Sequence, residues 1–144
     1  MFFLKILPDE ASITRFTHST DQATKVSRSL QRMRSASLLI RQVDRYFSAY
    51  ELSQLKFLIL IVIERDPERT SLRASEIASR LDVSKPVLHR TIQTLIADGL
   101  LVAEKDPQDR RAEQLALTDT GRAKLATVLP GYFDLTARHE WDDF

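Results

Sequence analysis

The sequence predicts a mostly helical α+β fold, and three observations support that prediction. Apolar residues recur at helical spacing over much of the 144-residue chain. Two short runs of strand character, residues 100–105 and 113–118, stand in its last third. The composition, with 43% hydrophobic and 28% charged residues, is that of a soluble globular protein. The length suits one domain or one protomer of a small oligomer.

The composition also excludes several kinds of site. The chain has no cysteine, which removes disulfides, thiol nucleophiles and cysteine-ligated zinc, and its three glycines form no phosphate-binding loop. The apolar start turns acidic too soon for a secretory signal, and the longest apolar run, residues 57–63, is too short to span a membrane. We therefore expect a cytoplasmic protein. Because the net charge is only +1, a nucleic-acid surface would depend on how the charges are arranged.

The first long element is predicted to be an amphipathic helix that ends at about Tyr50. Residues 1–18 are poorly patterned, with at most short helical pieces, and Ser19 and Gln22 then form a capping box. An apolar stripe follows at helical spacing: Val26, Leu30, Met33, Ser37, Ile40, Val43, Phe47 and Tyr50. The opposite face is basic: Lys25, Arg28, Arg32, Arg34, Arg41 and Arg45. We expect this face mainly to be solvated, with phosphate contacts by Lys25 and Arg28 left open.

Two shorter helices are predicted next. Ser53 is a suitable N-cap for a helix from Gln54 to about Arg65, which is apolar on nearly every side and belongs in the core. Asp66-Pro67 ends it. A short extended piece at 70–72 leads to a helix within residues 73–81, whose apolar face is Ala74, Ile77, Ala78 and Leu81. Arg73 stands where a capping hydroxyl is common, a local misfit.

The next helix carries the most informative face. After a tight turn at residues 82–84, Ser84 is its N-cap, Pro86 lies in its first turn and Asp98-Gly99 closes it. At about 100° per residue, one side is apolar, with Leu88, Ile92 and Leu95. The opposite side is polar: Pro86, Arg90 and Gln93, flanked by His89 and Thr94. Such side chains suit the reading of base edges, and Ser84 and Lys85 lie where the positive helix end would face a phosphate.

The two strand-like runs flank a charged loop. Asp106-Pro107 turns the chain, Arg110 and Arg111 stand at the tip, and Asp109 is placed to hold one arginine. Helix, turn, helix and hairpin together predict a winged helix-turn-helix. Its arginine-tipped wing would enter a minor groove or lie along phosphates. A polar hairpin loop held by an Asp–Arg pair explains the same residues about as well. A last helix is expected from Thr118-Asp119 to about Val128, interrupted by Pro130-Gly131.

From Ala74 to Arg122 the sequence resembles the MarR family of winged-helix transcriptional regulators. The most specific stretches are Asp106-Pro-x-Asp-Arg-Arg-Ala, Leu115-x-Leu-Thr and Thr120-Gly-Arg122, and the resemblance covers roughly residues 50–125. It implies a homodimer with interlocked terminal helices, two recognition helices in successive major grooves, and wings in flanking minor grooves. The recognition-helix positions that it implies are Ser84, Lys85, Pro86, His89, Arg90, Gln93 and Thr94. At the wing it implies Asp109 and Arg111, with Arg110 between them.

The resemblance is poorer at the ends. Family members usually follow the wing with two long helices that build the dimer interface, whereas only 26 residues follow Thr118 here. We therefore expect residues 1–50 to be an N-terminal extension and dimerisation helix with a larger share of the interface. Residues 51–118 would be the winged helix-turn-helix domain, and residues 119–144 a C-terminal helix and tail that contribute to the dimer.

Other sites are weaker alternatives. Tyr46, Phe47, Tyr50 and Phe57 could line a pocket for a small aromatic effector, although core packing explains them at least as well. A metal site built from His139, Glu140, Asp142 and Asp143 is less plausible than an ordinary solvated tail. We therefore predict no metal or cofactor. His89 lacks a nucleophile or carboxylate partner at a readable spacing, so no enzyme is expected.

Together these features predict a regulator that binds double-stranded DNA. The expected mode is a homodimer on a pseudo-palindromic operator that represses by blocking polymerase, with release by a ligand that changes the spacing of the recognition helices. The alternative is a winged-helix module that binds another protein and has lost DNA binding. The modest net charge and the short C-terminal part allow it.

Overall fold

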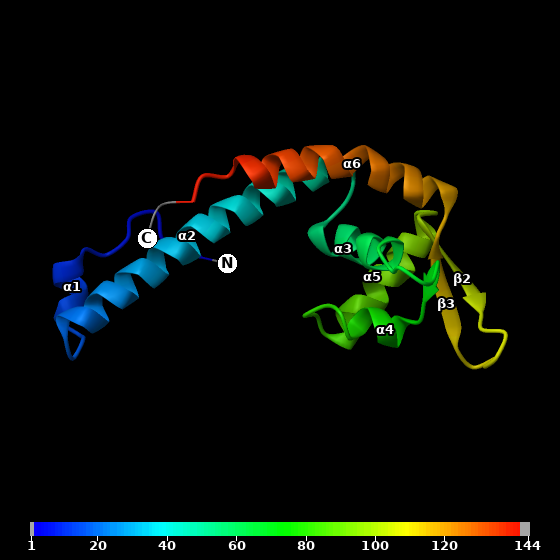
Figure 1. Cartoon of the computed structure of the whole chain (residues 1–144), viewed down its shortest axis with the longest axis horizontal. Coiled ribbons are helices and arrows are strands. Elements are labelled where there is room, and N and C mark those ends of the chain that lie inside the picture. The colour runs from blue at the N-terminus through cyan, green and yellow to red at the C-terminus, as the bar shows by residue number, and fades with distance from the viewer. Residues whose placement is uncertain (1, 142–144) are drawn as a thin grey trace. The chain divides into compact units, whose positions relative to one another are not determined.

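The computed structural model describes residues 2–141, which contain six helices and three strands (Figure 1). They form two compact units: one contains residues 46–132, and the other contains residues up to 45 together with those from 133 onward. Among these residues, no helix combines the length and the apolar character needed to cross a membrane. The sheet and helices α3, α4 and α5, whose bounds are given below, all belong to the first of these units, residues 46–132.

The other unit begins with two helices, α1 (Glu10–Thr14) and α2 (Thr20–Ser48). The predicted start of the long helix is confirmed, since the Ser19 hydroxyl accepts a hydrogen bond from the Gln22 N–H at 3.1 Å. The second arm of the predicted capping box is shifted by one residue. The Gln22 side chain accepts from the N–H of His18, at 2.6 Å, and not from that of Ser19. The first bond satisfies an N–H group in the first turn of α2, and the second ties the residue before the N-cap to that turn.

The first residues lie along α2 and are held there by its side chains. Arg41 donates to the carbonyl of Phe2 at 2.6 Å, and Arg34 donates to the carbonyl of Leu4 at 2.5 Å. Ser37 exchanges two hydrogen bonds with the backbone of Phe2. Two of the arginines that we expected to be solvated are thus bound to the chain's own backbone, because residues 2–4 lie against them.

The apolar stripe of α2 is only partly buried within this chain. Val43 is 2% and Phe47 0% exposed, whereas Val26, Met33 and Ile40 are 37%, 52% and 39% exposed. The helical periodicity therefore marked an apolar face correctly, but the described chain covers only its C-terminal part. Exposed apolar residues on one helix face indicate a surface that another element or molecule covers.

Residues 46–132 are built around α3 (Gln54–Glu64), as its composition predicted. The Ser53 hydroxyl caps it by accepting from the Lys56 N–H at 3.2 Å. The helix is buried through most of its length: Phe57, Ile59, Leu60, Val62 and Ile63 are each at most 2% exposed. Around it lie α4 (Ala74–Ala78), α5 (Lys85–Ala97) and the sheet (Figure 1).

The sheet has three antiparallel strands in the order β1-β3-β2. The predicted hairpin consists of β2 (Leu101–Lys105) and β3 (Glu113–Leu117). The short extended piece before α4 becomes β1 (Ser71–Leu72), in which Leu72 pairs with Leu115 of β3. The chain between α3 and α4 is thereby tied to the hairpin.

Helix α4 is shorter than the sequence suggested, and the turn after it is correspondingly longer. It ends at Ala78, with Ser79 as C-cap, so Leu81 lies outside it. The Ser79 hydroxyl donates to the carbonyl of Glu76 at 2.7 Å. This bond satisfies a carbonyl group in the last turn of α4.

The predicted interruption at Pro130-Gly131 is wrong, because α6 (Asp119–Arg138) runs through both residues. Pro130 removes one backbone donor, which alone would favour a break. The packing of the same stretch favours the helix instead. Val128 is fully buried, and the ring of Tyr132 lies 5.5 Å from that of Phe47, between centroids. These contacts depend on residues 128–132 remaining helical.

Candidate nucleic-acid interface

Helix α5 has the two faces that its sequence predicted. Ser84 caps it by accepting from the Val87 N–H at 3.4 Å, and Gly99 follows it with a left-handed φ of 76°. The apolar side is buried: Leu88, Ile92 and Leu95 are 3%, 3% and 0% exposed. This burial fixes the rotation of the helix, so its opposite face must point to solvent.

That exposed face carries every residue expected to contact DNA from this helix: Ser84, Lys85, Pro86, His89, Arg90, Gln93 and Thr94. The Thr94 hydroxyl donates to the carbonyl of Arg90 at 3.0 Å, so its remaining capacity is as an acceptor. The side chains of Arg90 and Gln93 extend from the same exposed face one turn apart, where both are free to reach an outside partner.

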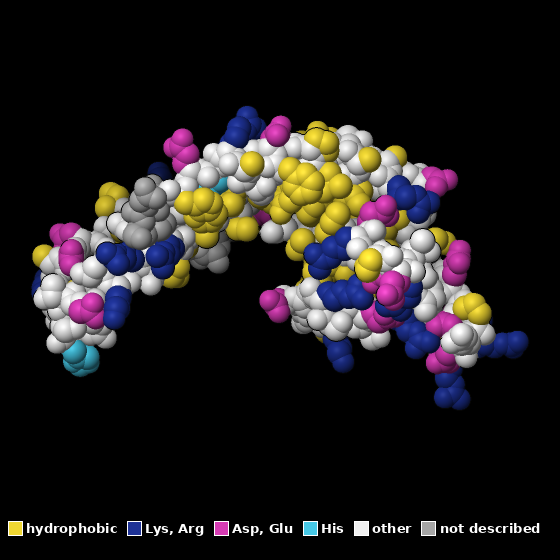
Figure 2. Space-filling view, viewed as in Figure 1, with side chains coloured by type: hydrophobic (Ala, Val, Ile, Leu, Met, Phe, Trp, Pro, Cys, Tyr) yellow, Lys and Arg dark blue, Asp and Glu magenta, His cyan; other side chains and the backbone are white. Residues whose placement is uncertain are grey.

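The loop between β2 and β3 is a compact turn with an exposed tip. The backbones of Asp106 and Ala112 close it, with Asp106 N–H donating to Ala112 at 3.0 Å. Arg110 and Arg111 are both exposed. Figure 2 shows Lys and Arg side chains protruding where Figure 1 places this loop.

Asp109 holds Arg111, but through the backbone. Its carboxylate accepts from the Arg111 N–H at 3.0 Å, and among the ion pairs of residues 2–141 none joins Asp109 to a wing guanidinium. The expected bracing of an arginine side chain is therefore replaced by a side-chain-capped turn. Both guanidinium groups remain available to an outside anion.

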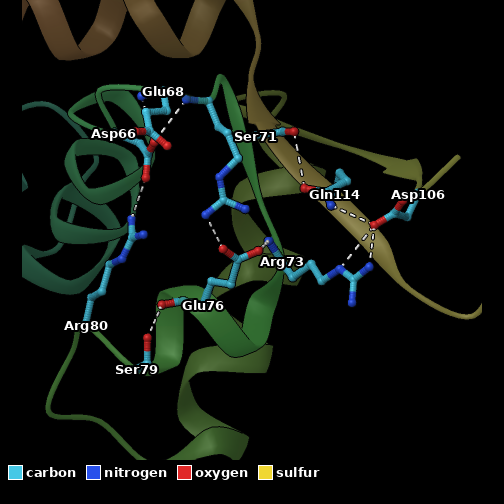
Figure 3. A network of polar contacts seen from close by, with 10 residues as sticks. Asp66, Glu68, Ser71, Arg73, Glu76, Ser79, Arg80, Asp106 and Gln114 are labelled. Atoms are coloured by element: carbon cyan, nitrogen blue, oxygen red, sulfur yellow. Dashed lines mark hydrogen bonds and ion pairs between the residues drawn. The ribbon is translucent and has the colours of Figure 1, made fainter. Parts of the chain in front are cut away.

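The carboxylate of Asp106 is the most heavily bonded group of the wing (Figure 3). It accepts from the Gln108 N–H at 2.8 Å, from the Gln114 amide at 2.9 Å, and from Arg73 Nη2 and Nε at 2.6 and 3.1 Å. The hydrogen bonds from Gln108, Gln114 and Arg73, in that order of effect, hold the pKa of Asp106 well below its usual range. Sequence reasoning assigned Asp106 only a turn and missed Arg73, although the misfit of Arg73 at the N-cap was a usable signal.

Helix α5 and the wing border one groove of about 430 Å³. From α5 it is lined by His89, Ile92 and Gln93, and from the wing by residues that include Lys105, Arg110 and Arg111. Arg73, Ala74 and Ser75 complete the lining at the start of α4. The polar face of the helix and the arginine tip therefore face the same space. Its cationic and amide groups suit an anionic polymer with hydrogen-bonding edges.

The four aromatic residues considered for an effector pocket pack on one another. The rings of Phe47 and Phe57 stack at 4.6 Å between centroids, and those of Tyr46 and Tyr50 lie 5.2 Å apart. Phe47 and Phe57 are at most 2% exposed, whereas Tyr46 and Tyr50 are half-buried. The two phenylalanines are thus part of the core, and the two tyrosines lie at its edge.

His18 and His139 are far in sequence from α5 and the wing, and they form hydrogen bonds with residues of other segments. His139 Nε2 is 3.1 Å from the Ser35 hydroxyl, and its ring meets that of Trp141 edge-on at 4.6 Å. Asp142 and Asp143, which we considered as metal ligands with His139, lie outside the described residues. Within residues 2–141, no three or more potential metal ligands of the His, Asp or Glu type come together.

Comparisons with known proteins agree with this geometry. Residues 50–112 match the sequence model of the MarR family. Over 132 residues the chain is 29% identical to the HTH-type transcriptional repressor YetL of Bacillus subtilis, covering 90% of this chain and 78% of YetL.

Solved structures show the same fold. AbsC, a MarR family transcriptional regulator from Streptomyces coelicolor, superposes with a TM-score of 0.75 at 23% identity, covering 89% of this chain and 84% of AbsC. Sco3205, a MarR family regulator from the same organism solved in complex with DNA, gives a TM-score of 0.74 at 25% identity, covering 89% of this chain and 79% of its own. The chain is thus similar to MarR family transcriptional regulators in the sequence of residues 50–112, in its likeness to the repressor YetL and in its winged-helix fold.

Proposed function

We propose that this protein is a sequence-specific repressor that binds a pseudo-palindromic operator as a homodimer. The observation that carries the proposal is the groove bordered by both α5 and the wing, in which His89, Gln93, Arg110 and Arg111 face one space. A duplex seated there would meet a base-reading helix and a cationic hairpin at once. Sco3205, whose fold is similar, was solved in complex with DNA, which supports DNA as the ligand.

In this proposal α5 is the recognition helix and enters the major groove. Arg90 would bind guanine and Gln93 adenine, the pairings that their donor and acceptor groups favour. His89 and Thr94 would contact neighbouring bases from the flanks of the face. Ser84, Lys85 and Pro86 begin the helix, where the backbone N–H groups and the positive dipole end favour a phosphate.

The wing would supply contacts that do not depend on sequence. Arg110 and Arg111 are exposed at the tip of a short loop, and their guanidinium groups would bind phosphates or enter the minor groove. The role of Asp109 would be to fix the turn that presents them, since it caps the Arg111 N–H.

The homodimer is supported by the uncovered face of α2. Met33 and Ile40 are 52% and 39% exposed on the stripe of this helix, and a second copy of the chain would cover them. Residues 1–50 and 119–144 would share the interface, with residues 51–118 bound to DNA. In analytical ultracentrifugation, Met33→Glu with Ile40→Glu is expected to yield a monomer from a dimeric wild type. A variant that sediments like wild type would contradict this assignment.

Repression would follow from occlusion of a promoter, and relatives such as YetL are named as repressors. A small aromatic effector would bind beside Tyr46 and Tyr50, because Phe47 and Phe57 are taken up by core packing. A thermal-shift screen of planar aromatic acids tests this part. A stabilising compound should lose its effect on Tyr50→Ala, and a compound that stabilises both proteins equally binds elsewhere.

The main experiment is the selection of bound fragments from genomic DNA by the purified full-length protein. We expect recovery of one pseudo-palindromic motif with half-sites about one helical turn, ~10 bp, apart. Affinity for that motif should fall steeply with salt, because phosphate contacts release counterions. No enrichment of any motif, together with stable capture of a partner protein, would replace this proposal with a winged-helix interaction module.

A further inference from the structure

The contact between Arg73 and Asp106 joins segments that are 33 residues apart in the chain. Arg73 is the residue between β1 and α4, at the entrance to the helix-turn-helix, and Asp106 directly follows β2 at the base of the wing loop. The guanidinium donates twice to one carboxylate oxygen, at 2.6 and 3.1 Å. The Asp106 side chain is only 8% exposed, so water screens this pair less than an ordinary surface pair.

Both partners are held in place by their own neighbours (Figure 3). The backbone N–H of Arg73 donates to the Glu76 carboxylate at 3.2 Å, and Glu76 is paired in turn with Arg69. On the other side, Asp106 also accepts from the amide of Gln114, whose oxygen lies 3.2 Å from the Ser71 hydroxyl. Exposed ion pairs are usually weak because both side chains lose conformational entropy when they pair. Arg73 and Asp106 are already ordered by their neighbours, so this entropy loss is small for them.

The wing loop has few other ties to the rest of the protein. The hydrogen bonds of its backbone, from Gln108 N–H to Asp106 and from Arg111 N–H to Asp109, remain inside the hairpin. Among the hydrogen bonds described for residues 106–112, those from Arg73 are the ones that come from outside the hairpin. Beyond the pairing of its strands in the sheet, the loop is therefore tied to the segment before α4 through Arg73.

We propose that Arg73 is a positioning residue for DNA binding, which holds the wing where Arg110 and Arg111 border the same groove as α5. This inference rests on the proposed DNA binding and assigns that function a residue outside both the recognition helix and the wing. Arg73 acts through Asp106: both its Nε and its Nη2 are engaged by that carboxylate.

A direct phosphate contact by Arg73 is the competing explanation, since its side chain is 38% exposed and lines the groove. The two explanations predict opposite effects of Asp106→Asn. Asparagine has a single oxygen, so it cannot serve both the Gln108 N–H and the Arg73 guanidinium as the carboxylate does. If Arg73 positions the wing, this variant weakens DNA binding. If Arg73 contacts DNA, the variant releases its guanidinium, removes a negative charge from the interface and strengthens binding.

The test measures fluorescence anisotropy of a labelled random-sequence duplex of about 25 base pairs, which accommodates two half-sites one turn apart. The full-length wild type is compared over a salt series with Arg73→Ala, Asp106→Asn, Arg111→Ala and the double variant Arg73→Ala/Arg111→Ala. We expect Arg73→Ala and Asp106→Asn each to weaken binding about tenfold, and the double variant to lose less affinity than the product of the two single losses, because only the contact of Arg110 then remains to be misplaced. Additive losses, or tighter binding by Asp106→Asn, would overturn the proposal.

Hydrogen exchange without DNA separates positioning from general stability and from the proposed function. The Gln108 and Arg111 amides should exchange at least about threefold faster in Arg73→Ala, while amides of α3 remain unchanged. Unchanged exchange at both wing amides would refute the anchoring. If Arg73→Ala does not fold, Arg73→Lys, which keeps the charge without the fork, is expected to show smaller changes in the same directions. A wild type that binds no duplex while its Arg73→Ala wing exchanges faster would refute DNA binding and retain the anchor.

Discussion

The hydroxyl of Tyr46 donates a hydrogen bond to the carbonyl of Val128 at 2.7 Å, and Gly131 lies beneath the same ring. A Cβ atom at Gly131 would come 2.3 Å from the Tyr46 oxygen and 2.8 and 2.9 Å from two ring carbons. The glycine therefore does not mark the end of a helix. Its missing side chain leaves room for the Tyr46 ring at the end of α2 to lie against α6.

Replacing this glycine should destabilise the protein, although alanine is the better helix former. Alanine alone would favour the helix by about 1 kcal/mol. The clash with Tyr46 opposes that gain, and we expect Gly131→Ala to lower the free energy of unfolding by about 1–3 kcal/mol net. Urea denaturation measures the change. In a Tyr46→Ala background the same substitution should be neutral or stabilising, and an equal loss in both backgrounds would show that the ring is not the cause.

Gly121 and Gly99 are required for different reasons, and their alanine variants should differ accordingly. A Cβ at Gly121 would lie 2.1 Å from the carbonyl oxygen of Leu100, a backbone atom that cannot rotate away. At Gly99 there is open space within 4 Å, and the cost comes from a φ of +76°. We expect Gly121→Ala to lower the free energy of unfolding by roughly 3 kcal/mol or more, and Gly99→Ala to lower it by about 1–2 kcal/mol.

Asparagine separates the two causes in the same denaturation experiments. It tolerates left-handed backbone better than alanine, so Gly99→Asn should recover part of the loss at that position. At Gly121 asparagine is larger and should be at least as harmful as alanine. Recovery by asparagine at Gly121, or none at Gly99, would contradict this assignment of causes.

The sequence predicted those parts of the fold that local chemistry determines. The caps at Ser53 and Ser84 and the left-handed Gly99 stand where they were expected, because each forms its structure with residues one turn away. The buried face of α5 was also predictable, since three aliphatic residues at helical spacing leave one possible orientation. The exposed face that would contact DNA follows from the same pattern.

The sequence could not predict what depends on distant residues. Pro130 is a local signal for a break, but the packing of Tyr132 on Phe47 and Phe57 keeps the helix intact. The partner of Arg73 lies 33 residues away, so only its misfit as an N-cap was visible. In both places a tertiary contact overrides a local preference.

The Asp106 cluster predicts a specific acid sensitivity. The hydrogen bonds of this cluster lower the pKa of Asp106 in the folded state. The ionised carboxylate therefore contributes fully to the free energy of unfolding at pH values above about 4, the pKa of an aspartate in the unfolded chain. That contribution is lost as the pH falls further toward the folded pKa. We therefore expect wild type to be more stable than Asp106→Asn at pH 7, with the difference shrinking as the pH is lowered below about 4.

Denaturation with urea at several pH values measures this difference. Glu104→Gln, which removes an exposed carboxylate from β2, is the matched control and should change stability little at any pH. If the difference in the free energy of unfolding between wild type and Asp106→Asn stays constant down to the lowest pH, the neighbours of the Asp106 carboxylate do not hold it ionised.

Base reading and phosphate binding should be separable by mutation. Arg90→Ala and Gln93→Ala are each expected to reduce the free energy of operator binding by on the order of 1–3 kcal/mol and to relax the base preference at the operator position that the side chain contacts. Binding to random DNA should remain nearly unchanged. Arg110→Ala and Arg111→Ala should weaken binding to all sequences alike. Each lost phosphate contact should also reduce the slope of log affinity against log salt by about one.

Anisotropy titrations of the selected operator, point-substituted operators and a random duplex, each over a salt series, resolve these effects. The division has a structural reason: Arg90 and Gln93 are fixed on a helix whose other face is buried, whereas Arg110 and Arg111 stand on a loop held mainly at its base. A rigid helix can discriminate base edges, while a loop can follow the phosphate backbone. If all four variants lose affinity equally for operator and random DNA, α5 does not read sequence.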